Sequence, residues 1–178
     1  LELTLGSYFK ELSTEEEFDF IFDDIKFHLS RYLYDQEKKF NIDKIDQSVF
    51  IEYLINPDKE LLLSDQIDLK AYFSKWRGKE INIEIATFNY TRIIDRLLKD
   101  KVKKNPFGKR KDGSIVKLSR ILHVHGFVDK NMVLGVNDEM QILNNDFKSN
   151  HYIKSSFIKE ECNGIFKNEV SNHFKGQI

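Results

Sequence analysis

Three short polar sequences hold the residues with the clearest potential for chemistry, and each of them follows an apolar run. They are Thr87-Phe88-Asn89-Tyr90-Thr91, His123-Val124-His125-Gly126 and Gly135-Val136-Asn137-Asp138. Histidine is the side chain best suited to exchange a proton near neutral pH, and asparagine is a neutral hydrogen-bonding group. Such residues at neighbouring strand ends would suit a polar pocket that contains a general base.

The surrounding sequence predicts strands that would bring these residues together. Residues 81–88 alternate between apolar and polar and then become fully apolar, which is typical of a strand entering a buried sheet. A helix with an apolar side follows directly, so this stretch predicts half of a βαβ unit. Further strands are predicted at 120–125 and 132–136, and residues 99–117 are predicted to be a basic loop. Because ligands of open α/β sheets bind beyond the carboxyl ends of the strands, we expect the three polar sequences to form one pocket at one sheet edge.

The rest of the chain predicts helices. Residues 1–78 are expected to form a helical subdomain, residues 79–140 an α/β core and residues 141–178 a C-terminal helical segment. Residues 1–5 give a hint of a strand, and further helices are predicted at 43–55 and 64–77.

One long helix is expected to begin near residue 14. Ser13 with Glu16, or Thr14 with Glu17, has the spacing of a capping box. An apolar stripe at steps of three and four follows and is expected to be largely buried. Its residues are Phe18, Ile21, Phe22, Ile25, Leu29, Tyr32 and Leu33.

The composition restricts the partners and the compartment. The 178 residues include 28 basic and 29 acidic side chains, for a net charge of −1, so nucleic acid is not an expected partner. The single cysteine, Cys162, excludes an intrachain disulfide and favours a reducing, cytoplasmic location. No apolar run reaches the roughly 18 residues of a membrane span, so a membrane partner is not expected either. The basic loop is expected to be solvated, with contact to a phosphate or a nucleic acid as its alternative.

The three polar sequences, in their order and spacing, resemble the AbiH family of bacterial abortive-infection proteins. Phe-Asn-Tyr-Thr, His-x-His-Gly and Gly-x-Asn-Asp carry this resemblance over residues 80–140. That family is in turn similar to sirtuin-like domains that bind or hydrolyse NAD. The resemblance therefore implies an α/β fold with a partial Rossmann-like, sirtuin-like sheet behind the N-terminal helical subdomain.

The resemblance also implies roles for individual residues. His125 corresponds to a general base acting on a ribose hydroxyl, and Asn89 to the asparagine beside the nicotinamide ribose. These would be the catalytic residues. Contacts to the nucleotide are expected from Thr87, Thr91, Gly126, Asn137 and Asp138. Thr91 stands where sirtuin-like domains more often carry aspartate. Cleavage of an N-glycosidic bond develops positive charge on the ribose, which explains why an asparagine and a histidine would both be needed.

The expected function is anti-phage defence, with NAD or a related nucleotide as ligand and a phage-derived protein as trigger. Residues 3–7 contain Gly6 but no second glycine, so they lack the glycine-rich phosphate turn of such proteins. The chain also begins without methionine, so we expect it to be a piece of a longer protein whose full form would be the NAD hydrolase. The alternative is a non-enzymatic sensor or interaction module with a vestigial pocket. Self-association is left open.

A metal site is the main chemical alternative for the histidines. His123 and His125 lie two residues apart in a predicted strand and would share one face, which is also a metal-ligand spacing. Asp129 or Asp138 could supply a further ligand. Because no third ligand is fixed by spacing, no metal is expected.

Overall fold

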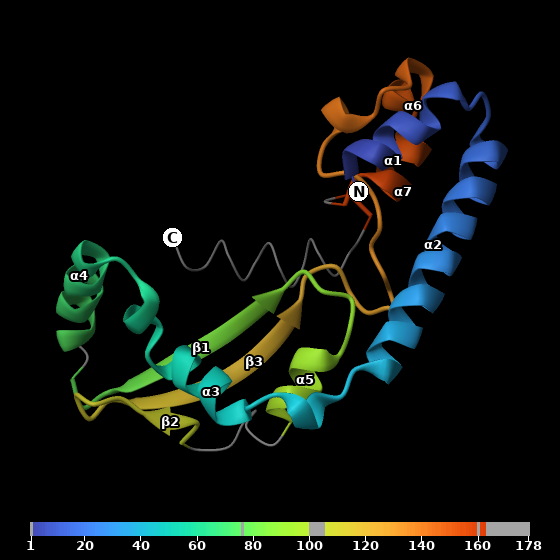
Figure 1. The fold of residues 1–178 in the computed structure, drawn as a ribbon. Coiled ribbons are helices and arrows are strands. Elements are labelled where there is room, and N and C mark those ends of the chain that lie inside the picture. The colour runs from blue at the N-terminus through green and yellow to red at the C-terminus, as the bar shows by residue number, and fades with distance from the viewer. Residues whose placement is uncertain (1, 76, 100–105, 160, 163–178) are drawn as a thin grey trace. The chain divides into compact units, whose positions relative to one another are not determined.

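The computed structural model describes residues 2–75, 77–99, 106–159, 161 and 162, which form a mixed α/β fold (Figure 1). These residues divide into two compact units. Unit 1 contains residues up to 39, residues 87–91 and the described residues from 123 onward, whereas unit 2 contains residues 40–86 and the described part of 92–122. The units therefore interleave along the chain and do not follow the ranges 1–78, 79–140 and 141–178. Trp76 and residues 160 and 163–178 of the predicted C-terminal helical segment lie outside the described residues.

Unit 1 begins with a helix where the sequence gave a hint of a strand. Helix α1 covers Glu2–Tyr8 and continues into the 3₁₀ helix η1 at Phe9–Glu11. Leu5 and Phe9 lie four residues apart on one side and are both buried. Gly6 lies so close to Gln141 that an added Cβ would be 1.8 Å from its carbonyl oxygen. The expected strand is therefore wrong, because a helical face buries the same apolar residues and gives Gly6 its packing contact.

The capping box predicts the start of the long helix correctly. Helix α2 covers Glu15–Lys39. Thr14 Oγ1 accepts a hydrogen bond from Glu17 N at 3.1 Å, and Glu17 Oε2 accepts one from Thr14 N at 3.3 Å. These reciprocal bonds satisfy backbone donors that the first turn of a helix leaves without partners.

The expected burial of the α2 stripe is confirmed in its first part. Phe18 and Phe22 are buried, and Ile21, Ile25, Leu29 and Leu33 are half-buried. Tyr32, in contrast, is 60% exposed, so the prediction is wrong for this residue. The periodicity fixes a common face, but burial also requires a partner over the full length of the helix.

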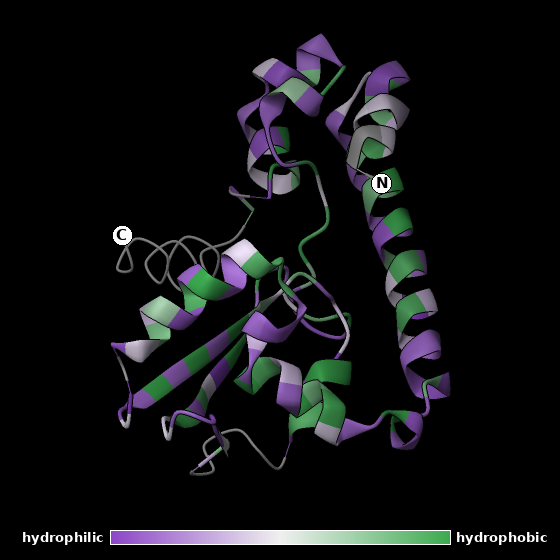
Figure 2. Cartoon of the chain, turned by 60° about the vertical axis from the view of Figure 1, so that its left-hand side comes forward, coloured by the Kyte–Doolittle hydropathy of each residue, from purple (hydrophilic) through white to green (hydrophobic). Residues whose placement is uncertain are grey.

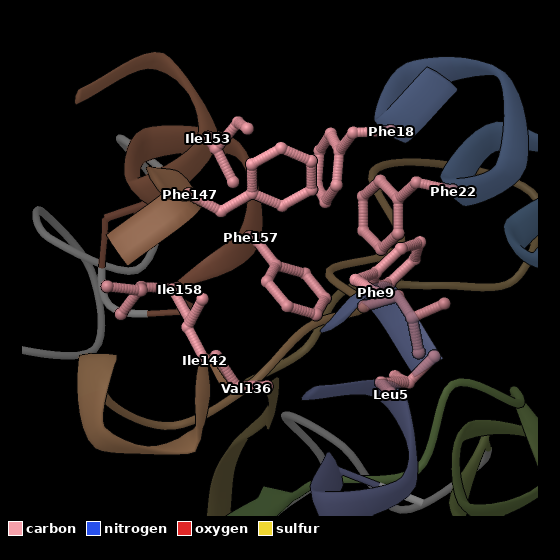
Figure 3. Close-up of a cluster of buried hydrophobic side chains, with 11 residues drawn as sticks. Leu5, Phe9, Phe18, Phe22, Val136, Ile142, Phe147, Ile153, Phe157 and Ile158 are labelled. Carbon is pink, nitrogen blue, oxygen red and sulfur yellow. The ribbon is translucent and has the colours of Figure 1, made fainter. Parts of the chain in front are cut away.

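The core of unit 1 joins both ends of the described chain (Figure 3). It brings α1 and α2 together with the 3₁₀ helix η4 (Glu139–Gln141) and with helices α6 (Asn145–Ser149) and α7 (His151–Phe157). Phe18 packs against four aromatic rings, with centroid separations of 5.0 to 5.7 Å. The buried side chains are Leu5, Phe9, Phe18, Phe22, Leu134, Val136, Ile142, Phe147, Ile153, Phe157 and Ile158.

Unit 2 contains a three-stranded sheet in the order β1-β3-β2. Strand β1 covers Glu80–Thr87 and β3 covers Ile115–His123. The Ile115 N–H donates to the Lys79 carbonyl at 3.0 Å and the Val124 N–H to the Thr87 carbonyl at 2.9 Å, so β1 and β3 run parallel (Figure 1). Strand β2, Gly108–Lys109, pairs antiparallel with β3. Figure 2 shows the hydrophobic alternation along β1 that predicted this strand.

The helices of unit 2 are α3 (Gln47–Ile55), α4 (Leu63–Ser74) and α5 (Ile93–Leu98), with the 3₁₀ helices η2 (Ile42–Lys44) and η3 (Pro57–Glu60). Helices α3 and α5 pack apolar residues against this sheet, whereas α4 contains no buried residue. The helices predicted at 43–55 and 64–77 are confirmed as α3 and α4 with different bounds, and α5 follows β1 as expected. The core of the unit is formed by the buried residues Ile55, Leu98, Phe107, Val116 and Leu118.

Two strand predictions need correction. Strand β3 begins at Ile115 and ends at His123, whereas the sequence predicted 120–125. The predicted loop 99–117 contains β2 and the start of β3 because Asp112 and Gly113 form a tight hairpin turn. Asp112 Oδ1 accepts a hydrogen bond from Ser114 N at 2.9 Å, and Gly113 has a φ of 91°. Lys101, Lys103 and Lys104 of this predicted loop lie outside the described residues.

The second correction concerns residues 132–136. This segment is buried and extended, but its one described ladder contact is an isolated parallel bridge between Val136 and Ile158. Gly135 lies so close to Phe157 that an added Cβ would be 2.0 Å from its carbonyl oxygen. The segment is apolar because it lies in the core of unit 1. An apolar run of this length is expected equally for a buried strand and for a buried segment outside a sheet.

No helix of the described residues has the length and the apolar character that crossing a membrane requires.

A pair of phenylalanines on α2 tests the core of unit 1. Phe18 is fully buried, whereas Phe20, two residues further along the helix, is 77% exposed. We expect Phe18→Ala to lower the free energy of unfolding by about 3–5 kcal/mol, because it removes a buried ring and leaves a cavity. Phe20→Ala should change it by about 0.5 kcal/mol or less. Urea denaturation followed by circular dichroism measures both, and equal losses would contradict the packing described above.

Candidate functional site

The carboxyl ends of β1 and β3 bring two of the three polar sequences together in unit 1. The hydrogen bond from Val124 N to the Thr87 carbonyl joins the carboxyl ends of both strands. Beyond it, Val128 N donates to the Tyr90 carbonyl at 2.8 Å. We call residues 87–91 and 123–127 the strand-end site. The sequence predicted that all three polar sequences would meet at one sheet edge, and the structure brings the first two together.

His123 has the environment of a structural residue. It is 8% exposed, and its Nδ1 lies 3.3 Å from the Asn89 carbonyl oxygen, a hydrogen bond that requires the proton on Nδ1. Its ring also packs on Phe127, with a centroid separation of 4.1 Å. His123 therefore holds the turn after β1 against the turn after β3.

His125 lies between two aromatic rings of the opposite turn. Its ring centroid is 5.2 Å from that of Phe88, in an edge-on arrangement, and 5.8 Å from that of Tyr90. His125 is half-buried, whereas Phe88 is 63% exposed. The two histidines thus contact different neighbours, and the more accessible one is His125.

Two hydrogen bonds to the backbone of Val133 hold His125 and Tyr90 in place. The Val133 N–H donates to the His125 carbonyl at 2.9 Å, and the Tyr90 hydroxyl donates to the Val133 carbonyl at 2.9 Å. The side chains of Phe88 and Tyr90 are therefore part of the site, although the sequence assigned them no role. Their position on both sides of Asn89 in the Phe-Asn-Tyr sequence is the signal that could have identified them.

Thr87, Thr91 and Asn89 lie at the β1 side of the site. Thr87 Oγ1 accepts a hydrogen bond from Asn89 N at 3.2 Å, which turns the chain after the strand. Asn89 is exposed and Thr91 is half-buried. Asn89 does not cap α5, which begins after Arg92 without a side-chain cap.

Asn137 and Asp138 do not end a strand of the sheet, so the expectation of three strand ends at one edge is wrong for the third sequence. The Asn137 N–H donates to Gln141 Oε1 at 2.7 Å, and Asn137 Oδ1 lies 3.5 Å from Lys159 Nζ. Asp138 Oδ1 accepts a hydrogen bond from Met140 N at 2.8 Å and caps η4. The physical reason is the packing of residues 132–136 on Phe157 and Ile158, which directs the chain toward the helices of unit 1.

Gly126 is required by the turn itself. Its φ is 71°, its N–H donates to the His123 carbonyl at 3.2 Å, and an added Cβ would lie 2.0 Å from the Asn131 carbonyl oxygen. The sequence predicted that Gly126 contacts a nucleotide, but the group that lies close to Gly126 in the structure is the backbone of Asn131.

The described residues contain no group of three or more His, Cys, Asp or Glu side chains that could hold a metal ion. β3 ends at His123, and His125 follows in a turn, so the common strand face that the metal alternative assumed does not extend to both residues.

Two adjoining cavities of unit 1 lie along α2, and neither is lined by Asn89 or His125. One of about 360 Å³ is lined by Phe22, Lys26, residues 131–134, Ser155, Ser156 and Cys162. The other, of about 460 Å³, is lined by residues 128–132 and by Asp23, Lys26, Phe27 and Ser30. Burial raises the pKa of the Cys162 thiol to about 11, which keeps it protonated near neutral pH.

Comparison with known proteins gives no match to a family model, a curated protein or a solved structure. The strand-end site is therefore interpreted from its geometry and chemistry.

Comparison of Gly126 with Gly78 separates the effect of a positive φ from that of close packing. Gly78 has nearly the same φ, 73°, but nothing lies within 4 Å of an added Cβ. We expect Gly78→Ala to cost about 1–2 kcal/mol of unfolding free energy, the cost of a left-handed alanine. Gly126→Ala should cost more, because its Cβ would also displace the Asn131 carbonyl. Thermal denaturation checks this order, and an equal loss in both variants would show that the turn after β3 is not tightly packed.

The raised pKa of Cys162 predicts slow alkylation. In the native protein, the rate with iodoacetamide should rise about tenfold per pH unit from pH 7 to 10 without a plateau, because the thiolate is the reactive form. In urea-unfolded protein the rate should be far higher at pH 8 and level off above about pH 9, as expected for an ordinary thiol of pKa about 8.5. A plateau near pH 8.5 in the native protein would contradict the buried environment of Cys162.

Proposed function

We propose that the strand-end site binds NAD or a related nucleotide, with His125 and Asn89 facing the ribose. The observation that carries this proposal is the parallel pairing of β1 and β3, which puts Asn89, His123 and His125 at neighbouring carboxyl strand ends. In open α/β sheets this is where nucleotides bind. In the chain order β1–α5–β2–β3, the parallel strands β1 and β3 are joined through a connection that contains a helix, as in the βαβ units of Rossmann-like sheets. This supports a partial Rossmann-like, sirtuin-like fold, to which the short antiparallel strand β2 is added.

The side chains of the site suit the two halves of a nucleotide. Phe88 is an exposed aromatic ring on which a base could stack. The Asn89 side chain is a neutral donor and acceptor for ribose hydroxyls, and an imidazole such as that of His125 can take a hydroxyl proton. Thr87, Thr91 and Gly126 frame these groups, whereas Asn137 and Asp138 contact other residues of unit 1.

Binding is the activity proposed for the chain as described, and NAD hydrolysis is proposed for a longer form. A hydrolase of this kind also holds the dinucleotide phosphates, usually in a glycine-rich turn at a helix N-terminus. Gly6 lies within α1 against the Gln141 carbonyl, where it serves packing and not a phosphate. By its resemblance to AbiH proteins, the chain is proposed to act in anti-phage defence, triggered by a phage-derived protein.

Binding of NAD is tested by calorimetric titration of single-site variants. We expect His125→Ala, Asn89→Ala and Phe88→Ala each to weaken NAD binding at least about tenfold, which corresponds to about 1.4 kcal/mol of binding free energy. The melting temperature should change little for Asn89→Ala and Phe88→Ala, because both side chains are exposed. In a longer form that consumes NAD, His125→Ala should lower the rate about 10²–10⁴-fold, as loss of a general base does.

Two further histidine variants serve as controls. His151→Ala removes an exposed histidine from α7 of the same unit and should leave NAD affinity unchanged. His123→Ala should mainly lower stability, because His123 is buried against Asn89 and Phe127. Unchanged affinity in His125→Ala, or no binding by the unmodified protein, would favour the non-enzymatic interaction module.

A further inference from the structure

Unit 2 contains a cavity of about 510 Å³ that is separate from the strand-end site. Its walls come from η3, from α4 and from the β2–β3 hairpin. The lining residues are Asn56, Asp58, Lys59, Gln66, Lys70, Phe73, Ser74, Arg77, Arg110, Lys111 and Asp112. The volume is within the range of small-molecule sites, which is about 300–1,000 Å³.

The charge of this lining differs from that of the whole protein. The cavity is lined by five basic side chains (Lys59, Lys70, Arg77, Arg110 and Lys111) and two acidic ones (Asp58 and Asp112), for a net charge of +3, whereas the full sequence has a net charge of −1. Positive charge gathered in a concave surface raises the local concentration of anions. The cavity is therefore a local basic site on a nearly neutral protein.

Arg110 forms a rigid floor for the cavity. Its side chain is 7% exposed, Nη2 donates to Asp58 Oδ1 at 2.9 Å, and Nη1 donates to the Ile55 carbonyl at 2.6 Å. The guanidinium also lies over the Phe73 ring, 4.0 Å from its centroid. These contacts join the hairpin to η3 and α4, so they fix the backbone positions from which the other basic side chains extend.

One hydrogen-bond donor of Arg110 is unsatisfied within the described residues. Its buried Nε has no hydrogen-bond partner there, and Asp112 Oδ2 lies 3.9 Å away, beyond hydrogen-bond distance. Asp112 instead accepts a hydrogen bond from the Ser114 N–H, and this bond, together with Arg110 and Arg77, lowers the pKa of its carboxyl.

Lys70 and Lys111 form no direct ion pair with a carboxylate within the described residues, so both are available to an anionic ligand. Lys70 Nζ lies 3.2 Å from Gln66 Oε1, which is a neutral acceptor. Lys111 is exposed and interacts at longer range with Glu52, whose direct partner is Lys59. Two cations that line the same cavity, one on α4 and one on the hairpin, can contact the same anion.

We propose that this cavity binds a small molecule that carries a phosphate group, held between Lys70 and Lys111. A phosphate presents several acceptor oxygens and up to two negative charges, which suits several converging cations better than a single carboxylate does. Phe73 supplies an apolar surface for the rest of such a ligand. The site lies in unit 2 and does not depend on the function proposed for the strand-end site.

The test is calorimetric titration with sodium pyrophosphate at constant ionic strength. The double variant Lys70→Gln/Lys111→Gln should bind pyrophosphate at least about tenfold more weakly than the unmodified protein, since each charge-assisted contact contributes appreciably to affinity. The control is Lys75→Gln/Lys109→Gln, which has the same net charge and changes lysines outside the cavity on the same two segments, α4 with its C-cap and the β2–β3 hairpin. Lys75 follows α4 and Lys109 lies in β2, and neither lines the cavity. Its affinity should remain within about twofold of the unmodified protein.

Several outcomes would overturn the proposal. Equal weakening in both double variants would mean a diffuse charge effect, and absence of saturable binding by the unmodified protein would mean no site. Tighter binding of a single-stranded oligonucleotide that both double variants weaken equally would indicate a nucleic-acid surface instead. Circular dichroism melting confirms that each variant is folded. His125→Ala should leave pyrophosphate binding unchanged, which distinguishes failure of this site from failure of the strand-end site.

Discussion

The parallel pairing of β1 with β3 is the interaction on which the arrangement of the strand-end site depends. An antiparallel pair would place the Phe-Asn-Tyr and His-x-His turns at opposite ends of the strands, whereas a parallel pair places both carboxyl ends side by side. The backbone bond between Thr87 and Val124 marks that junction. A parallel connection needs a crossover, which here includes α5. The β2–β3 hairpin then adds an antiparallel strand on the other edge of β3.

Around this junction, two histidines of one short sequence have different physical roles. His123 is buried and bonded to Asn89, so its replacement removes a contact between the two turns. His125 follows the end of β3, lies between the rings of Phe88 and Tyr90, and remains partly accessible. In a continuous strand, alternation would place His123 and His125 on the same face. Because β3 ends at His123, the two side chains have different neighbours, and only His125 of the two remains accessible to a ligand.

Unit 2 contains a buried ion pair beside its apolar core. Burying Arg110 and Asp58 costs desolvation energy that their attraction need not recover in full. The pair is supported by the Ile55 carbonyl and by the Phe73 ring, so the guanidinium has one geometry. We interpret this rigidity as the reason that the hairpin and α4 can present Lys111 and Lys70 at fixed positions around the cavity.

Local patterns in the sequence determined the elements whose signals are local. The capping box of Thr14 and Glu17, the alternation of 80–87 and the proline that follows α3 each depend on neighbours a few residues away, and these elements were predicted. The tertiary structure decided the rest. Residues 132–136 are apolar enough for a strand, but Val136 pairs with Phe157 and Ile158 and not with a strand of the sheet. Asn137 then contacts Gln141 and Lys159. The cavity around Arg110 joins residues more than 50 positions apart, as its bond to Asp58 shows. Hydrogen bonds and ion pairs between distant segments depend on how the chain packs, which no local pattern specifies.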